Sequence, residues 1–113
     1  MEAASRGCVL AGGLTLGILP GKDPAAANPW VAIPLPTGLG EARNALVARA
    51  GHAVVAVGGS WGTLSEIALA RKMGLEVALL GESLFHLPLP RFVSVDAAVE
   101  WALRQEGRPG SEG

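Results

Sequence analysis

The sequence predicts an α/β fold, an open doubly wound parallel sheet with helices on both faces. Short apolar runs rich in β-branched residues alternate with longer helical segments, which is the pattern of a parallel sheet. The run from Val54 to Val57 is apolar throughout, as expected for a strand covered on both faces. It leads directly into a glycine-rich turn and a helix start at residues 58–63. These observations together define a strand-turn-helix unit inside a parallel sheet.

Glycine and proline mark the boundaries of the elements expected in the first half of the chain. Pro34 places the second strand near a sheet edge or end, because proline cannot donate to a strand ladder. The last helix of this half carries an apolar stripe that includes Ala42, Ala45, Leu46 and Ala50. The predicted elements are a helix over Glu2–Ala11 closed by Gly12-Gly13, a strand over Thr15–Leu19 stopped by Pro20-Gly21, a loop over Lys22–Pro29, a strand over Trp30–Leu35 and a helix over Leu39–Arg49 ended by Gly51.

The second half continues the alternation of strands and helices. Asp96 is predicted to cap the last helix, and Glu100 and Trp101 are interpreted as structural residues of that helix. We expect one domain over residues 1–106 and a disordered tail over residues 107–113. The predicted elements are a strand over His52–Val57, a helix over Thr63–Met73 stopped by Gly74, a strand over Glu76–Leu80, a strand over Phe92–Val95 and an amphipathic helix over Asp96–Gln105.

Composition and charge argue against several classes of protein. The chain has 113 residues, of which 50% are hydrophobic, and this suits one domain with a modest core. Nine basic and ten acidic residues nearly cancel, so no nucleic-acid partner is expected. The uncharged segments are interrupted by proline or are too short to span a membrane. Two separate histidines and one cysteine, Cys8, suggest no metal site and fit a reducing cytoplasm.

The glycine-rich turn is the candidate ligand site. Glycine lets the backbone turn sharply and approach a ligand, and the free amides of a helix N-terminus attract an anion. The G-G-x-x-G spacing matches neither a Walker loop, which ends in Gly-Lys-Ser/Thr, nor the G-x-G-x-x-G dinucleotide fingerprint. The residues predicted to bind a phosphate are Gly58, Gly59, Ser60, Gly62 and Thr63.

Four side chains of the candidate site have two interpretations each. Thr63 and Glu66 fit a T-x-x-E capping box, in which Glu66 bonds back to the Thr63 amide; alternatively, the Glu66 carboxylate acts on a ligand. Arg43 is either a solvated helical arginine or a guanidinium that binds a phosphate. Trp61 either stacks on a base or pterin or packs at a subunit interface. The residues alone leave these alternatives open.

The segment from Gly58 to Glu66 resembles the G-G-x-G-T-x-x-E signature of the Lonely Guy family, also called lysine decarboxylase-like, with one extra residue before Gly-Thr. Three further segments resemble one branch of that family, which includes molybdenum-cofactor carrier proteins and uncharacterised bacterial proteins. These segments are Gly12–Gly21, Asn28–Trp30 and Thr37–Asn44. The resemblance covers residues 1 to 81 and implies a Rossmann-like sheet.

Two functions follow from this resemblance. One is the binding of a phosphorylated nucleotide or a pterin-type cofactor, such as the molybdenum cofactor, at the glycine-rich turn. The other is a nucleoside 5′-monophosphate phosphoribohydrolase, which needs no cofactor. In that enzyme Arg43 holds the substrate and Glu66 acts at the ribose as the base leaves. Asn44 stands where classical enzymes have lysine, and Val57 where they have proline, and both differences favour the carrier.

Lysine decarboxylation is the function we expect least. Lys22 and Lys72 are the lysines of the chain, and neither has the sequence context of a pyridoxal-phosphate lysine. The resemblance also implies a homodimer or a higher homo-oligomer. Met1–Cys8 resembles the interior of a helix that follows a β-α-β portion in the family. We therefore expect a truncated chain that lacks the first strands of the family sheet.

Overall fold

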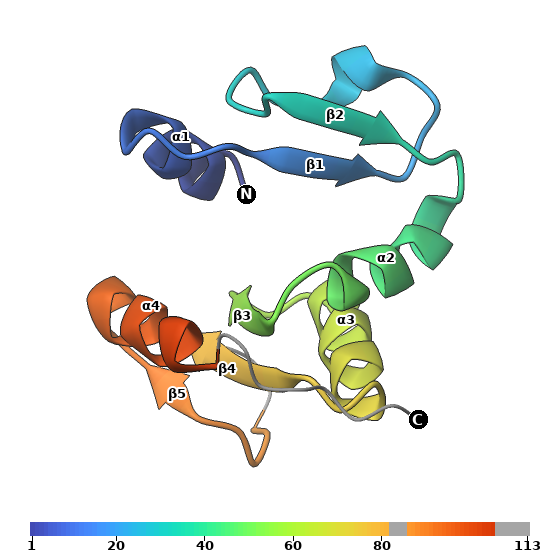
Figure 1. Ribbon diagram of the computed structural model, residues 1–113. Helices are drawn as coiled ribbons and strands as arrows, with labels where there is room; N and C mark the ends of the chain where they lie inside the picture. Colours follow the sequence, from blue (N-terminus) through green and yellow to red (C-terminus); the bar gives the residue numbers. More distant parts are fainter. Residues whose placement is uncertain (82–85, 106–113) are drawn as a thin grey trace. The chain divides into compact units, whose positions relative to one another are not determined.

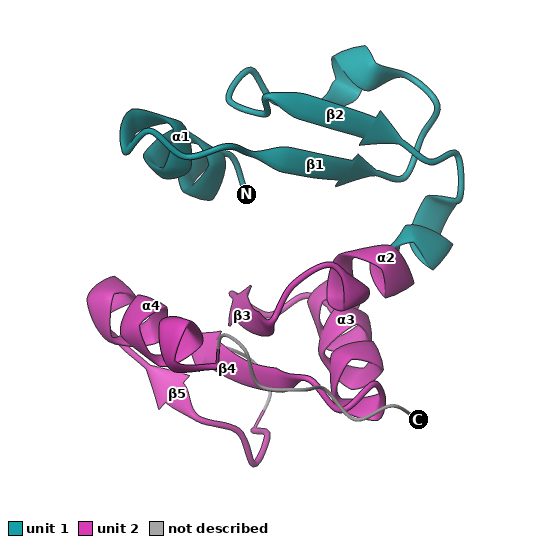
Figure 2. Cartoon of the chain, in the orientation of Figure 1, with its two compact units in different colours: residues 1–43 teal, residues 44–113 magenta. Residues whose placement is uncertain are grey.

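The computed structural model describes residues 1–81 and 86–105, and the chain divides into two compact units, residues 1–43 and 44–113 (Figures 1 and 2). Each unit contains parallel strands and helical segments, which confirms the predicted α/β fold. The predicted tail over residues 107–113 lies outside the described residues, and the prediction of one domain stays a prediction.

The first unit contains a two-stranded parallel sheet. Leu16 of the first strand lies opposite Ile33 of the second, and Leu19 lies opposite Pro36. Its elements are the helix α1 (Glu2–Leu10), the strands β1 (Leu16–Leu19) and β2 (Ile33–Pro36), and the short 3₁₀ turns η1 (Pro24–Ala26) and η2 (Gly40–Arg43).

The prolines of β2 lie on the side of the strand that faces away from β1. The Ile33 amide donates to the Thr15 carbonyl, and the Thr37 amide donates to the Leu19 carbonyl. Alternate residues of a strand face the same neighbour, so Pro34 and Pro36 place their missing N–H groups on the outer edge. This confirms the predicted edge position of Pro34.

β2 begins at Ile33, three residues later than predicted. The Asn28 side chain accepts a hydrogen bond from the Trp30 amide at 3.0 Å, which makes a local turn. The Thr15 hydroxyl donates to the Trp30 carbonyl and accepts from the Ala32 amide, each at 2.7 Å. These side-chain bonds take up the backbone groups that a longer strand would use.

Gly12 and Gly13 end α1 in a Schellman motif. The Gly13 amide donates to the Cys8 carbonyl at 2.8 Å, and the Gly12 amide donates to the Val9 carbonyl at 3.0 Å. Gly12 has a φ of +84°, a conformation that glycine adopts without strain. The glycine pair is therefore the helix stop that the sequence predicts.

The second unit is a three-stranded parallel sheet in the order β3-β4-β5 with three helices. Ala53 pairs with Glu76 and Val57 pairs with Leu80, so β3 and β4 end at the same edge of the sheet. β4 has the predicted bounds. The elements are α2 (Asn44–Arg49), β3 (Ala53–Val57), α3 (Trp61–Lys72), β4 (Glu76–Leu80), β5 (Arg91–Phe92) and α4 (Val95–Arg104).

Small and branched apolar side chains form the core of the second unit. Ala48 of α2 and Ala70 of α3 are both 0% exposed, and side chains of this size let the two helices pack closely. The buried cluster consists of Ala48, Ala56, Ile67, Ala70, Val77 and Leu79.

The predicted helix over Leu39–Arg49 is wrong in its first part and in its buried face. Residues 40–43 form the 3₁₀ turn η2, and the α-helix begins only at Asn44. A 3₁₀ turn has about 3.0 residues per turn rather than about 3.6, so a stripe counted through it loses its phase. Ala42, Leu46 and Ala50 are exposed, whereas Asn44 and Ala48 are buried, and α2 packs against α3.

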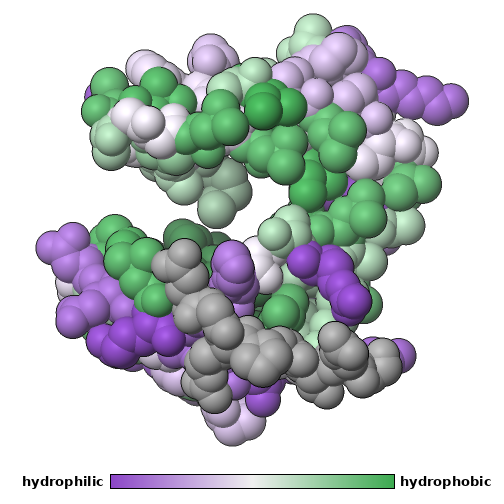
Figure 3. All heavy atoms as spheres, in the orientation of Figure 1, coloured by the Kyte–Doolittle hydropathy of each residue, from purple (hydrophilic) through white to green (hydrophobic). Residues whose placement is uncertain are grey.

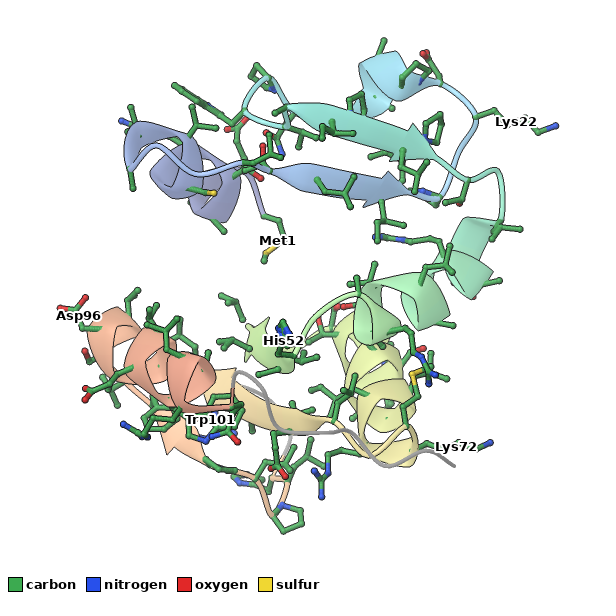
Figure 4. All side chains as sticks on the ribbon, in the orientation of Figure 1. Met1, Lys22, His52, Lys72, Asp96 and Trp101 are labelled. Carbon is green, nitrogen blue, oxygen red and sulfur yellow. The ribbon has the colours of Figure 1, made fainter. Side chains whose placement is uncertain are left out.

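The prediction that Asp96 caps α4 is wrong, because Ser94 occupies that position. The Ser94 hydroxyl accepts a hydrogen bond from the Ala97 amide at 3.3 Å. Asp96 lies in the first turn of α4 (Figure 4), where a carboxylate interacts favourably with the positive end of the helix. β5 accordingly ends at Phe92 rather than at Val95.

Trp101 fixes α4 to the sheet of the second unit (Figure 4). Its side chain is 8% exposed, and its ring centroid lies 6.3 Å from that of Phe92. Glu100 lies on the exposed side of α4, 3.6 Å from Arg104. Both residues therefore have the structural roles that the sequence analysis gave them.

Apolar side chains also reach the surface of both units (Figure 3). In the first unit they include Leu14, Leu16 and Leu35, and in the second Val99 and Leu103. Within residues 1–81 and 86–105, no helix has the length and apolar character needed to cross a membrane.

Replacing Trp101 with alanine is expected to lower the free energy of unfolding by about 3 kcal/mol, because the change leaves a cavity between α4 and the sheet. Leu103→Ala is the control on the same helix, and its side chain is 64% exposed. That control is expected to change stability by less than about 0.5 kcal/mol. Urea unfolding followed by circular dichroism measures both. Equal losses in the two variants would contradict the assigned packing of α4.

Candidate functional site

The glycine-rich turn lies at the edge of the second unit where β3 and β4 end. Gly58 directly follows β3 and Gly81 directly follows β4, and both have a φ of +80°. A Cβ atom at Gly58 would meet no other atom within 4 Å. The backbone conformation, rather than crowding, therefore requires glycine at position 58. The chain turns there and starts α3 three residues later.

Ser60 is the N-cap of α3. Its hydroxyl accepts a hydrogen bond from the Thr63 amide at 3.1 Å and lies 3.0 Å from the Thr63 hydroxyl. Of the two alternatives for Thr63, capping of the helix is therefore wrong, and Thr63 is the third helical residue. The two hydroxyls form a pair at the helix start. The amides of the first two helical residues, Trp61 and Gly62, have no acceptor within the helix.

Glu66 is the sixth residue of α3 and is partly exposed. A capping box places its acidic residue third in the helix, and Thr63 holds that position with its amide bonded to Ser60. Residues three apart lie on one face of a helix, so Glu66 follows Thr63 by one turn on the same face. The carboxylate is thus placed behind the hydroxyl pair.

Arg43 ends η2 in the first unit and is partly buried. Its Nη1 donates to the Ile18 carbonyl of β1 at 3.1 Å. The guanidinium is thereby anchored to the strand and differs from a freely solvated helical arginine. This bond uses one of the five N–H donors of the group, and the others remain suitable for an anion. Ser60, Thr63 and Glu66 belong to the second unit.

The chemistry of the turn suits an anion. Residues 58–65 contain no carboxylate, and they offer two hydroxyls beside the positive end of the 12-residue helix α3. Among the described residues, no group of three or more His, Cys, Asp or Glu is placed to hold a metal ion. Lys22 is exposed and extends away from the ribbon of the first unit (Figure 4). Anion binding at the start of α3 is chemically compatible with this arrangement and stays a prediction.

Trp61 is the first residue of α3, and its two interpretations, stacking on a ligand or packing at a subunit interface, both stay predictions. It is 80% exposed and directly follows the Ser60 cap. The sequence shows that Trp61 lies between the glycines of the turn. The exposure of its side chain depends on tertiary packing and cannot be predicted from that position.

Several known proteins are similar to this chain in sequence or in fold. The model of the SLOG cluster4 family matches residues 1–102. An uncharacterised protein of Archaeoglobus fulgidus is 42% identical over 80 residues, which are 71% of this chain and 52% of that protein. The chain thus spans about half the length of this relative. The solved molybdenum cofactor binding protein from the phototrophic bacterium Rippkaea orientalis is 36% identical, with a TM-score of 0.85 over 92% of this chain and 69% of that one.

This structural likeness supports the Rossmann-like character of the fold. The narrower assignment to the Lonely Guy family stays a prediction. These similarities do not test the predicted site residues. Arg43, Glu66 and the residues of the glycine-rich turn therefore stay predictions.

Ser60→Ala and Ser94→Ala each remove the N-cap of a helix, α3 and α4 respectively. In both cases the serine hydroxyl accepts a hydrogen bond from the backbone amide three residues later. Each is expected to lower stability by about 1 kcal/mol, because the third helical amide loses its acceptor. Thermal unfolding followed by circular dichroism measures the loss. An unchanged melting temperature in Ser60→Ala would contradict its assignment as the cap of α3.

Proposed function

Because the chain belongs to the SLOG cluster4 family, we propose that it binds a phosphorylated nucleotide or pterin-type cofactor, in the manner of a molybdenum-cofactor carrier. The observation that carries this proposal is the start of α3, where Gly58 turns the chain and Ser60 and Thr63 pair their hydroxyls at the positive end of the helix. The phosphate of the ligand binds there. The similar protein from Rippkaea orientalis, a molybdenum cofactor binding protein, supports the class of ligand.

The molybdenum cofactor combines a pterin with a phosphate, and the donors of the turn fit the phosphate. Amides and hydroxyls donate to phosphate oxygens, and the dipole of α3 favours the negative charge. A Cβ built at Gly62 would find only the Ser60 hydroxyl, at 3.7 Å, so the surface of the first helical turn is open. The bound group would contribute the molybdenum chemistry, while these residues orient its phosphate end.

A nucleoside 5′-monophosphate phosphoribohydrolase is the second candidate function. The position of Glu66 favours it, because the carboxylate lies one helical turn behind the proposed phosphate site rather than in a capping box. A carboxylate there would stabilise positive charge at the ribose or activate water as the base leaves. Arg43, anchored on β1, would hold the substrate.

Gly62→Asp is expected to weaken the binding of AMP or inorganic phosphate by about tenfold or more, because it places a carboxylate at the anion site. An acidic residue in the first helical turn also favours the helix, so the melting temperature should stay the same or rise. Gly62→Asn is the control of equal size without the charge, and it should bind more tightly than Gly62→Asp. Isothermal titration calorimetry measures the affinities. Equal affinity in the aspartate and asparagine variants would contradict an anion site at this helix start.

Incubation of the purified chain with AMP and other nucleoside monophosphates separates the two functions. A hydrolase would release free base and ribose 5-phosphate, which chromatography detects. Glu66→Gln keeps the shape of the side chain and removes its charge, and it should abolish any release by a hydrolase. Binding without release by the wild-type chain is the result expected for a carrier. Release that persists in Glu66→Gln would exclude Glu66 from the reaction.

A further inference from the structure

Helix α4 carries apolar side chains on two of its sides. On one side, Ala98 and Trp101 are buried, and the helix contacts all three strands of the second unit. On another side, Val95, Val99 and Leu103 are 62%, 51% and 64% exposed. Residues four apart lie close together on a helix, so these three side chains form one continuous apolar row, which we call the α4 ridge.

The charged residues of α4 form a second row beside the ridge. Asp96, Glu100 and Arg104 are also four apart, each follows a ridge residue by one position, and all three are exposed. Glu100 and Arg104 lie 3.6 Å apart. The ridge is therefore bordered on one flank by charges that are negative near the start of the helix and positive at its end.

This distribution is typical of a helix that is covered on two sides. A helix at the surface of a single domain needs one apolar stripe, and the remainder of its circumference is polar. Single exposed aliphatic residues are common, but a contiguous apolar row bordered by charges is a feature of interaction surfaces. The α4 ridge therefore has the character of a contact surface.

We propose that the α4 ridge is a homodimer interface, in which the ridge packs against the α4 ridge of a second copy of this chain in the antiparallel direction. The two copies are related by a two-fold axis, so the contact is made by the same surface on both. Val99 then lies against Val99 of the second copy, and Val95 lies against its Leu103. This surface belongs to a different helix from the proposed phosphate site and goes beyond the proposed function.

The order of the charges favours a second copy as the partner and sets the orientation. In an antiparallel pair related by a two-fold axis, the charged flanks of the two helices meet, and Asp96 of each copy faces Arg104 of the other. A parallel pair would place like charges together, Asp96 beside Asp96 and Arg104 beside Arg104. Charges that flank an apolar helix contact select the partner and its direction in this way. Glu100, at the middle of the flank, has the Arg104 guanidinium of its own helix as a counter-ion.

The size of the ridge indicates how strong the contact is. Helix α4 has 10 residues and is about 15 Å long. One such helix offers less surface than the about 800 Å² per partner that a stable complex buries. The dimer is therefore expected to be reversible and to depend on protein concentration.

Sedimentation equilibrium of the full chain over a series of concentrations tests the interface. The apparent mass of the wild-type chain is expected to rise from that of a monomer toward that of a dimer. Val99→Lys should keep the chain monomeric, because association would bury an ammonium group at the centre of the ridge. Leu46→Lys is the matched control, since Leu46 of α2 is also an exposed apolar residue, at 42%. It should associate like the wild-type chain.

A pair of charge reversals tests the antiparallel orientation. Asp96→Arg places two arginines opposite each other, and Arg104→Asp places two aspartates opposite each other, so each variant alone should associate several-fold more weakly than the wild-type chain. In an equimolar mixture of the two variants, every facing pair has opposite charges again, and association should return. Thermal unfolding of each variant checks that it is folded, and the mixture contains the same two proteins, so its recovery does not depend on their stability.

Three results would overturn the proposal. A wild-type chain that stays monomeric at every concentration would exclude the dimer. Association of Val99→Lys equal to that of the wild-type chain, or an equal loss in Leu46→Lys, would place the contact on another surface. A mixture of the two charge variants that associates no better than either alone would exclude the antiparallel pairing of α4.

Discussion

The parallel pairing of β3 with β4 is the constraint on which the candidate site depends. With Val57 paired to Leu80, both strands end at one edge, and each is followed by a glycine with a φ of +80°. Parallel strands need helical crossovers, so the helix that follows β3 must begin at that edge. The start of α3, with its positive dipole end, thereby lies beside the strand ends, where open α/β sheets bind ligands.

Capping by Ser60 decides what the neighbouring side chains do. Once the Ser60 hydroxyl accepts the Thr63 amide, the Thr63 hydroxyl is held at 3.0 Å beside it. With Ser60 as the cap, Glu66 is the sixth residue of α3, whereas the acidic residue of a capping box is the third. This hydrogen bond makes Ser60 the capping residue. The start of α3 therefore carries two paired hydroxyls, and the Glu66 side chain follows Thr63 by one helical turn. This arrangement suits both a phosphate site and chemistry near it.

Close packing holds this helix start in place. Ala48 and Ala70 carry the smallest apolar side chains, and their burial lets α2 lie tightly against α3. Trp101 covers the other part of the sheet through its contact with Phe92. In the first unit, a different device positions Arg43, whose guanidinium bonds to a β1 carbonyl. Rigid elements therefore position the candidate residues of each unit, and a ligand would find them largely preorganised.

The sequence by itself determined the features that depend on local chemistry. The apolar run of β4, the edge position of Pro34 and the glycine stops of α1 and α3 were predictable, because backbone freedom and missing donors act at single positions. Gly74 illustrates this, since its φ of +80° completes a Schellman motif after α3. The glycine-rich turn could be placed for the same reason.

Only the tertiary structure decided which of several local options was used. Ser60 and Thr63 are both able to cap a helix, as are Ser94 and Asp96, and the path of the chain out of the preceding strand selected the serine in both cases. Contacts with α3 determine which face of α2 is buried. The 3₁₀ turn before Asn44 could not be predicted from the spacing of apolar residues in the sequence. The exposure of Trp61 is of the same kind, because it depends on what every other element leaves uncovered.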